Sequence, residues 1–163
     1  MQERFSGCEM VEMGIQIEKN GKEFYSELAE KFKKESVGEV FKCLAAEEEK
    51  HIEVFNGIFA SLCSYLPEEA YPDEYFAYMN ALASQYVFTR KNTGKTIAEK
   101  LKNYDEGLNL GISFEKDSIL FYEGMRQMVL ERDYKLIDKL IQEEKEHLKK
   151  LCELRRKDKD EEC

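Results

Sequence analysis

The sequence predicts an all-α protein, a four-helix bundle in which two antiparallel helix hairpins are joined by a long, partly helical crossover. Its 163 residues include only 9 glycines and 2 prolines, and 36% of them are charged. That balance is typical of long amphipathic helices rather than of sheets with many turns. Apolar residues also return at helical spacing along four long segments. The length fits one domain, so we assign residues 1–163 to a single domain.

The first hairpin is predicted from helices over about 6–34 and 36–65. The apolar stripe of the first of these helices includes Met10, Ile17, Phe24, Leu28 and Phe32. Ser36 is followed three residues later by Glu39, a capping-box pattern that favours a helix start at Ser36. A short turn should therefore join the two helices.

The crossover is predicted over residues 66–104, where prolines and aromatic residues interrupt the helical pattern. Pro72 is a favourable first-turn residue, so one short helix is expected to begin there. A second short helix is expected after Thr96, with Glu99 completing another capping box. The crossover should therefore be long but partly ordered.

The second hairpin is predicted from helices over about 105–131 and 133–157. The turn between them is expected near Glu131. The charged run over 155–163 should form a solvated, frayed tail.

Charge and cysteine content limit the classes of function. The formal net charge of −9 argues against nucleic acids and anionic membranes as partners, because both require a basic surface. No apolar run has the length of a membrane span, and the first residues lack the apolar core of a signal peptide, so a cytoplasmic protein is expected. The five cysteines form no C-x-x-C pair. We therefore expect incidental thiols rather than a disulfide framework or a four-cysteine metal site.

The two predicted hairpins repeat each other in sequence. Residues 14–25, which begin Gly-Ile-Gln-Ile-Glu and end Phe-Tyr, match residues 111–122, which begin Gly-Ile-Ser-Phe-Glu and end Phe-Tyr. Residues 44–51 match residues 140–147, and each of these segments ends in a histidine. The offsets between the matched segments are 97 and 96 residues. The chain therefore looks like a duplicated helix pair.

The two histidines of the chain each lie three residues after a glutamate, within the repeated segments. Residues at i and i+3 project from one face of a helix, so each glutamate and histidine form a two-ligand set. In the first hairpin, Glu18 and His51 are equally far along the chain from the predicted turn. In the second hairpin, the same holds for Glu115 and His147. All six side chains can therefore meet in one layer of the bundle. The predicted metal ligands are Glu18, Glu48, His51, Glu115, Glu144 and His147.

The charge of these residues indicates which cofactor would accompany them. Four buried carboxylates would be strongly destabilising without compensation, and two divalent cations would supply the four positive charges needed. Carboxylate-rich sites with one imidazole per metal suit iron or manganese better than structural zinc. We therefore predict two iron ions, with manganese as an alternative. The contrasting hypothesis is a metal-free helical interaction module whose glutamates lie on the surface.

These motifs resemble the rubrerythrin family of ferritin-like di-iron carboxylate proteins. The resemblance is carried by Gln-Ile-Glu-Lys around Glu18, by the following Phe-Tyr, by Glu-Glu-Glu-Lys-His ending at His51, and by their counterparts in the second half. It covers residues 10–35, 37–62 and 108–151. The resemblance implies that Glu48 and Glu144 bridge the two irons. It implies that Glu18 and Glu115 are terminal carboxylates, and that His51 and His147 each bind one iron.

Two departures from the family pattern shape the expected function. Rubrerythrins usually carry another glutamate one turn after the third-helix ligand, where this chain has Ser118, so a more symmetric, bacterioferritin-like site is expected. The 163 residues also contain no four-cysteine rubredoxin domain, so an external electron donor such as rubredoxin is expected. The resemblance implies reduction of hydrogen peroxide. The alternatives are a ferroxidase that uses O₂, or oxygenation of an organic substrate in an apolar pocket beside the metals.

Tyr25 and Tyr122 each lie seven residues after a predicted terminal carboxylate. That spacing returns them to nearly the same helix face, so their hydroxyls could hydrogen-bond the ligand carboxylates. Alternatively, both fill the core, where a buried tyrosine needs a polar partner in any case. The aromatic crossover offers a surface for pairing, so a homodimer is expected, with the long connection either exchanged or not exchanged between protomers.

Overall fold

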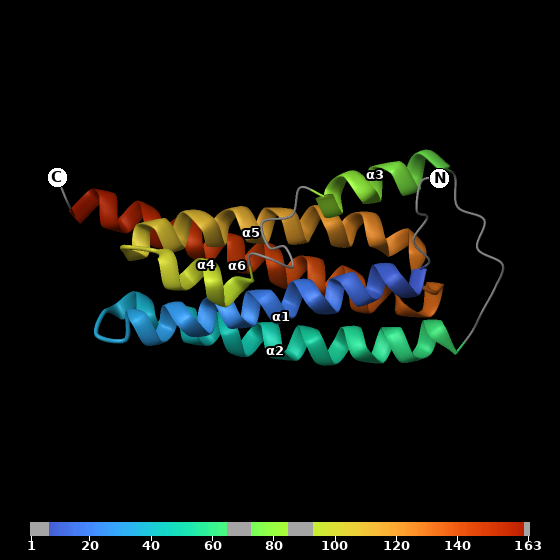
Figure 1. Cartoon of the computed structure of the whole chain (residues 1–163), viewed down its shortest axis with the longest axis horizontal. Helices are drawn as coiled ribbons and strands as arrows, with labels where there is room; N and C mark the ends of the chain where they lie inside the picture. The colour runs from blue at the N-terminus through green and yellow to red at the C-terminus, as the bar shows by residue number, and fades with distance from the viewer. Residues whose placement is uncertain (1–6, 65–72, 85–92, 162–163) are drawn as a thin grey trace.

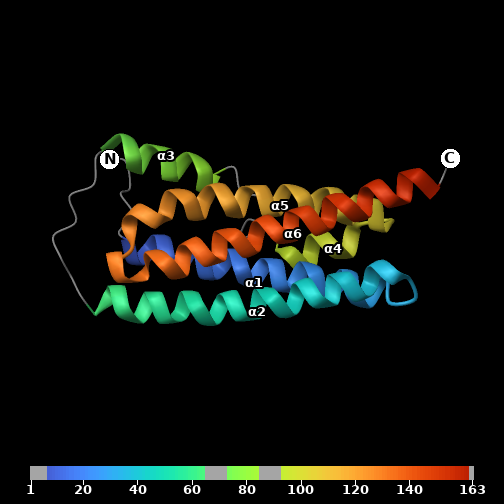
Figure 2. The same cartoon turned by 180° about the vertical axis from the view of Figure 1, so that it is seen from behind.

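The computed structural model describes residues 7–64, 73–84 and 93–161. Its four long helices are α1 (Gly7–Lys31), α2 (Ser36–Cys63), α5 (Tyr104–Met125) and α6 (Tyr134–Glu161). Figures 1 and 2 show them side by side as a bundle, with α1 antiparallel to α2 and α5 antiparallel to α6. The prediction of an all-α four-helix bundle is confirmed. Among the described helices, none is long and apolar enough to cross a membrane.

The turn between α1 and α2 is short and depends on a glycine. The amide of Glu35 donates to the carbonyl of Phe32, and the amide of Gly38 donates to the carbonyl of Glu35. A Cβ at Gly38 would lie 2.4 Å from the Phe32 carbonyl oxygen, so only glycine fits here without a shift. Helix α2 begins at Ser36 as predicted, but the predicted capping box is wrong, because the N-cap residue is Glu35 and it makes no side-chain cap hydrogen bond.

The second hairpin turns earlier than the sequence predicts. Helix α5 ends at Met125 rather than Glu131, and two short 3₁₀ segments, η1 (Arg126–Met128) and η2 (Glu131–Asp133), lead into α6. Met128 is fully buried and Val129 is 6% exposed, and the backbone is extended at Val129. The chain therefore leaves the helix in order to close the end of the bundle with apolar side chains.

The C-terminal helix runs further than the sequence predicts. Helix α6 continues to Glu161. The prediction of a frayed tail over 155–163 is therefore wrong for residues 155–161, and the last two residues lie outside the described part of the chain. The 28 residues of α6 form an uninterrupted helix, because the charged run contains no helix-breaking residue.

The crossover contributes two short helices, α3 (Asp73–Ser84) and α4 (Gly94–Lys100). Pro72, the predicted start of the first, lies outside the described residues. Helix α4 begins at Gly94 rather than after Thr96. The side chain of Thr93 caps this helix, because its hydroxyl oxygen accepts a hydrogen bond from the amide of Thr96. The amide of Gly94 donates to Asn20 Oδ1 on α1 at 3.1 Å. Helix α4 is thereby attached to α1, while α3 lies along α5 (Figure 1).

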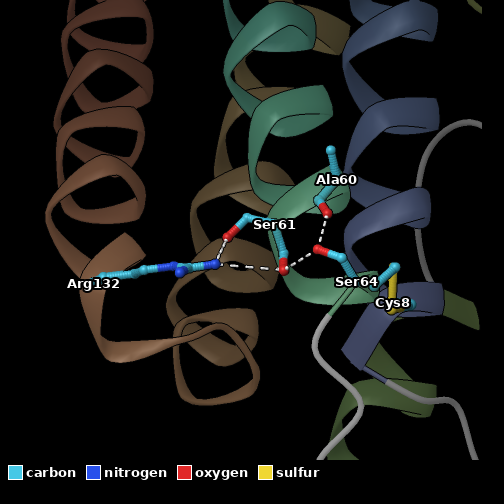
Figure 3. Close-up of a disulfide and its surroundings, with 6 residues drawn as sticks. Cys8, Ala60, Ser61, Ser64 and Arg132 are labelled. Carbon is cyan, nitrogen blue, oxygen red and sulfur yellow. Dashed lines mark hydrogen bonds between the residues drawn. A yellow bond between two sulfur atoms is a disulfide. The ribbon is translucent and has the colours of Figure 1, made fainter.

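A disulfide between Cys8 and Cys63 corrects the expectation that the cysteines are incidental thiols. It joins the first turn of α1 to the last turn of α2, with the two Cα atoms 5.7 Å apart (Figure 3). Arg132 reaches the same end of α2 and donates to the Ser61 hydroxyl (Figure 3). Two further cysteines, Cys43 and Cys152, are free. The open end of the first hairpin is therefore fixed covalently.

Candidate metal centre

The six predicted ligands meet inside the bundle, contributed by all four long helices. Helix α1 carries one glutamate and α5 another, while α2 and α6 each carry a glutamate and a histidine. The four glutamates are fully buried, and the two histidines are 2% exposed. The hypothesis that these glutamates lie on the surface is therefore excluded. The residues are Glu18, Glu48, His51, Glu115, Glu144 and His147.

Two overlapping groups of four residues could each hold one cation. In each group, one ligand atom per residue lies within 4.8 Å of all the others. Glu48 and Glu144 belong to both groups, as the predicted bridging role requires. The first group is completed by Glu18 and His51, and the second by Glu115 and His147.

Most of the polar atoms of this cluster lack hydrogen-bond partners. Both carboxylate oxygens of Glu48 and of Glu144 are buried and unsatisfied, as are Oε2 of Glu18 and of Glu115. Nδ1 of each histidine is also without a hydrogen bond. Leaving one such group unpaired costs about 1–3 kcal/mol, and more when it is charged. A set of partnerless oxygens and ring nitrogens that face each other fits divalent cations.

The electrostatics of the glutamates show how crowded the negative charge is. Burial, followed by repulsion from Glu48 and Glu144, raises the pKa of Glu18 well above its ordinary value. Burial and the charge of Glu144 likewise raise the pKa of Glu115. Without cations, these two carboxyl groups therefore favour their protonated forms.

The histidines respond in the opposite way to the same charges. Burial alone would lower the pKa of His51, but its contacts with Glu144 and Glu18 raise that pKa far above its ordinary value. The pKa of His147 is raised in the same way by Glu115 and Glu144. In turn, both imidazoles lower the pKa of Glu144 despite its burial. The metal-free cluster therefore retains protons that bound cations would displace.

Tyr25 and Tyr122 both bind carboxylates of the cluster. The hydroxyl of Tyr25 donates to Glu115, and the hydroxyl of Tyr122 donates to Glu18. Of the two predicted roles, hydrogen bonding to the carboxylates is the one that the structure shows. Each bond crosses from one hairpin to the other, rather than returning to the glutamate seven residues earlier. A Cβ at Gly111 would lie 3.2 Å from the Tyr25 oxygen, so this glycine makes room for the hydroxyl.

Ser118 and its repeat counterpart Gly21 are small residues one turn after the predicted terminal carboxylates Glu115 and Glu18. Ser118 is 1% exposed. A Cβ at Gly21 would lie 3.4 Å from the carboxyl carbon of Glu48 and 2.5 Å from Cζ of Phe114. Neither position supplies a fifth carboxylate, so the two groups have matching ligand types. This agrees with the symmetric site expected from Ser118.

Sequence reasoning missed two carboxylates on the outer side of the histidines, those of Glu47 and Glu143. Each lies within 3.2 Å of a histidine Nε2. The signal was available, because the two residues are 96 positions apart and each directly precedes a predicted bridging glutamate. They also line a cavity of about 170 Å³ that opens toward both imidazoles, together with charged residues of α2 and α6.

Comparison with known proteins agrees with this geometry. The family model for Rubrerythrin matches residues 9–155. The fold is also similar to the crystal structure of a Thermotoga maritima protein proposed to be a ferritin-like diiron-carboxylate protein, with a TM-score of 0.66. That pair shares 28% sequence identity over 96% of this chain and 98% of the other. No curated protein matches the chain.

Proposed function

Because the chain belongs to the rubrerythrin family, we propose that it is a di-iron oxidoreductase that reduces hydrogen peroxide with electrons from an external donor. The observation that carries the proposal is the closed cluster of four carboxylates and two imidazoles whose inner atoms lack partners. Two divalent cations would balance the four carboxylate charges. One imidazole per metal among oxygen ligands suits iron, with manganese as the alternative.

The chemistry that two irons would supply is the delivery of two electrons together, which is the number that hydrogen peroxide needs to become two water molecules with two protons. The chain itself positions and shields that site. Burial raises the pKa of Tyr25, with a further contribution from the Glu115 charge, so its hydroxyl stays protonated and donates to the carboxylate. The four carboxylates are excluded from bulk water by complete burial.

The cavity beside the histidines supports a small polar substrate. Its volume is about 170 Å³, and its lining includes three lysines and three glutamates. An apolar organic substrate would need an apolar pocket next to the metals, and this opening is charged. Hydrogen peroxide, a small polar molecule, therefore fits this opening better than an apolar organic molecule does.

A ferroxidase is the second candidate, and the carboxylates of the same opening favour it. Glu47, Glu143 and Glu146 line the opening beside the histidines, and their carboxylate oxygens are ligands that ferrous ions could bind. In this alternative iron is a substrate that passes through the site, whereas in the peroxidase the irons stay in place.

Stopped-flow absorbance of the reduced, iron-loaded protein distinguishes these functions. We expect hydrogen peroxide to oxidise both irons in one fast step, and O₂ to react more slowly. Sustained turnover should require a separate reductant such as rubredoxin. If O₂ reacts much faster and excess ferrous iron is consumed, the ferroxidase is correct instead. Glu144→Ala serves as the control, because it removes a carboxylate shared by both groups.

We also propose that the protein is a homodimer. The proposal rests on the aromatic residues of the crossover sequence, which a second copy could cover. Light scattering on the purified protein should give twice the mass of the chain. A 24-subunit shell would instead favour iron storage.

A further inference from the structure

We infer that Glu47 and Glu143 are positioning residues that orient the two predicted metal-binding imidazoles, each from the opposite helix hairpin. The inference rests on the proposed metal site and adds two residues to it. Both glutamates directly precede a predicted bridging carboxylate in the repeated segments.

The contacts are equivalent in the two halves. Oε2 of Glu47 lies 2.8 Å from Nε2 of His147, and Oε2 of Glu143 lies 3.2 Å from Nε2 of His51. Glu47 is on α2 and His147 on α6, while Glu143 is on α6 and His51 on α2. The two imidazole rings are stacked between these carboxylates, with centroids 5.5 Å apart and planes at 17°.

Each ring therefore faces carboxylates on both sides. The inner nitrogen Nδ1 lies among the predicted ligand carboxylates, at 2.8 Å from Glu144 for His51 and at 3.4 Å from Glu144 for His147. A neutral imidazole carries one N–H and one lone pair. When Nε2–H donates to the outer carboxylate, the lone pair is left on Nδ1, where a cation would bind. Without the outer acceptor, the inner carboxylates would draw the proton to Nδ1 and block that atom.

The outer carboxylates are themselves held in place. Nζ of Lys150 lies 3.2 Å from Oε2 of Glu47, and Nζ of Lys139 lies 3.6 Å from Oε1 of Glu143. The side chains of Glu47 and Glu143 are 35% and 42% exposed, so they are partly covered rather than free in solvent. These contacts limit the rotamers that each glutamate can adopt while it faces the histidine.

Together with the tyrosines, these contacts follow one rule. The hydroxyls of Tyr25 and Tyr122 hold the terminal carboxylates of the opposite hairpin, and Glu47 and Glu143 hold the histidines of the opposite hairpin. Every predicted ligand that belongs to only one metal group is thus oriented from the other half of the duplicated chain. The full ligand set is correctly oriented only when the two hairpins are docked.

The test compares Glu47→Ala and Glu143→Ala with Glu146→Ala in the full chain. Glu146 lines the same opening, but its carboxylate contacts Lys149 and Gln142. Binding of ferrous iron and of Co²⁺ is measured by competition with a chelator. Each of the first two variants should weaken one of two bound metals by about 10- to 100-fold, while Glu146→Ala should match the wild type. Glu47→Gln and Glu143→Gln, which keep an oxygen acceptor, should restore most of the affinity.

A spectroscopic readout separates positioning from a general loss of structure. In the Co²⁺-loaded protein, the shifted imidazole N–H proton of His147 should move or exchange faster in Glu47→Ala, and that of His51 in Glu143→Ala. Glu47→Leu and Glu143→Leu, which keep the side-chain volume without an acceptor, repeat the test if an alanine variant does not fold.

Two negative results have different meanings. If the wild type binds two metals and the Glu47 and Glu143 variants bind them as Glu146→Ala does, with unchanged N–H signals, the positioning role is wrong. If the wild type binds no metal, the proposed function fails and this inference fails with it.

Discussion

Breaking the Cys8–Cys63 disulfide should destabilise the protein substantially. The bond links residues 55 positions apart, and it fixes the end of the first hairpin that lies opposite the α1–α2 turn. Chain-entropy estimates give about 4 kcal/mol for a loop of this length. For a domain of this size, 1 kcal/mol shifts the melting temperature by about 2–4 °C. Reduction should therefore lower the melting temperature by roughly 8–16 °C.

The assay is thermal unfolding of the metal-free protein, followed by circular dichroism with and without a phosphine reductant. The double variant Cys8→Ser, Cys63→Ser should melt at the temperature of the reduced wild type and should not respond to reductant. Cys43→Ser is the matched control, because Cys43 is a free and exposed thiol. The reasoning is refuted if reduction leaves the melting temperature unchanged, or if the unfolded, unreduced chain shows as many titratable thiols as the reduced one.

Three further predictions concern the metal site. Tyr25→Phe should lower the free energy of unfolding of the metal-loaded protein by about 1.5–3 kcal/mol in urea titrations, because Glu115 loses a hydrogen bond to a charged group; no change would argue against that bond. Glu144→Ala should lose both metals and His51→Ala mainly one, as counted by metal analysis after dialysis; equal losses would contradict the shared carboxylate. Because the folded metal-free cluster has two glutamates and both histidines with raised pKa values, it holds more protons than the unfolded chain above about pH 5. Its melting temperature should therefore fall as pH rises from about 5.5 to 8, and a rise would contradict this sign.

Much of the fold follows from local sequence patterns. The four long helices carry continuous apolar stripes, and their existence and order were predicted correctly. The errors lie at helix ends, and tertiary contacts contribute at two of them. Burial of Met128 and Val129 ends α5 early, and Asn20, far away in sequence, receives the first amide of α4 at Gly94. Such contacts leave no periodic signal in the sequence.

The disulfide was missed for a related reason. Cys8 and Cys63 are separated by two whole helices, and neither belongs to a spaced cysteine motif. Their proximity follows from the lengths of α1 and α2, which place both residues at the same end of the hairpin. Once the turn is placed near residues 32–35, the helix lengths bring both cysteines to the same end, but the packing of the helices decides whether their side chains meet.

The candidate site was more predictable than the turns because it is encoded twice. Duplication marked the six inner residues, and the equal distances from each turn placed them in one layer. What the duplication could not show is which partner each side chain reaches. Tyr25 contacts Glu115 rather than Glu18, and Glu47 contacts His147, because the hairpins pack face to face.

The central claim is that this chain holds two iron ions between its hairpins. The most direct measurement is anomalous scattering, at the iron and manganese edges, from crystals of the protein as purified. We expect two peaks at the iron edge, roughly 3.5–4 Å apart, with Glu48 and Glu144 between them and one histidine Nδ1 beside each. A single peak, peaks away from these residues, or no peak at either edge would contradict the claim.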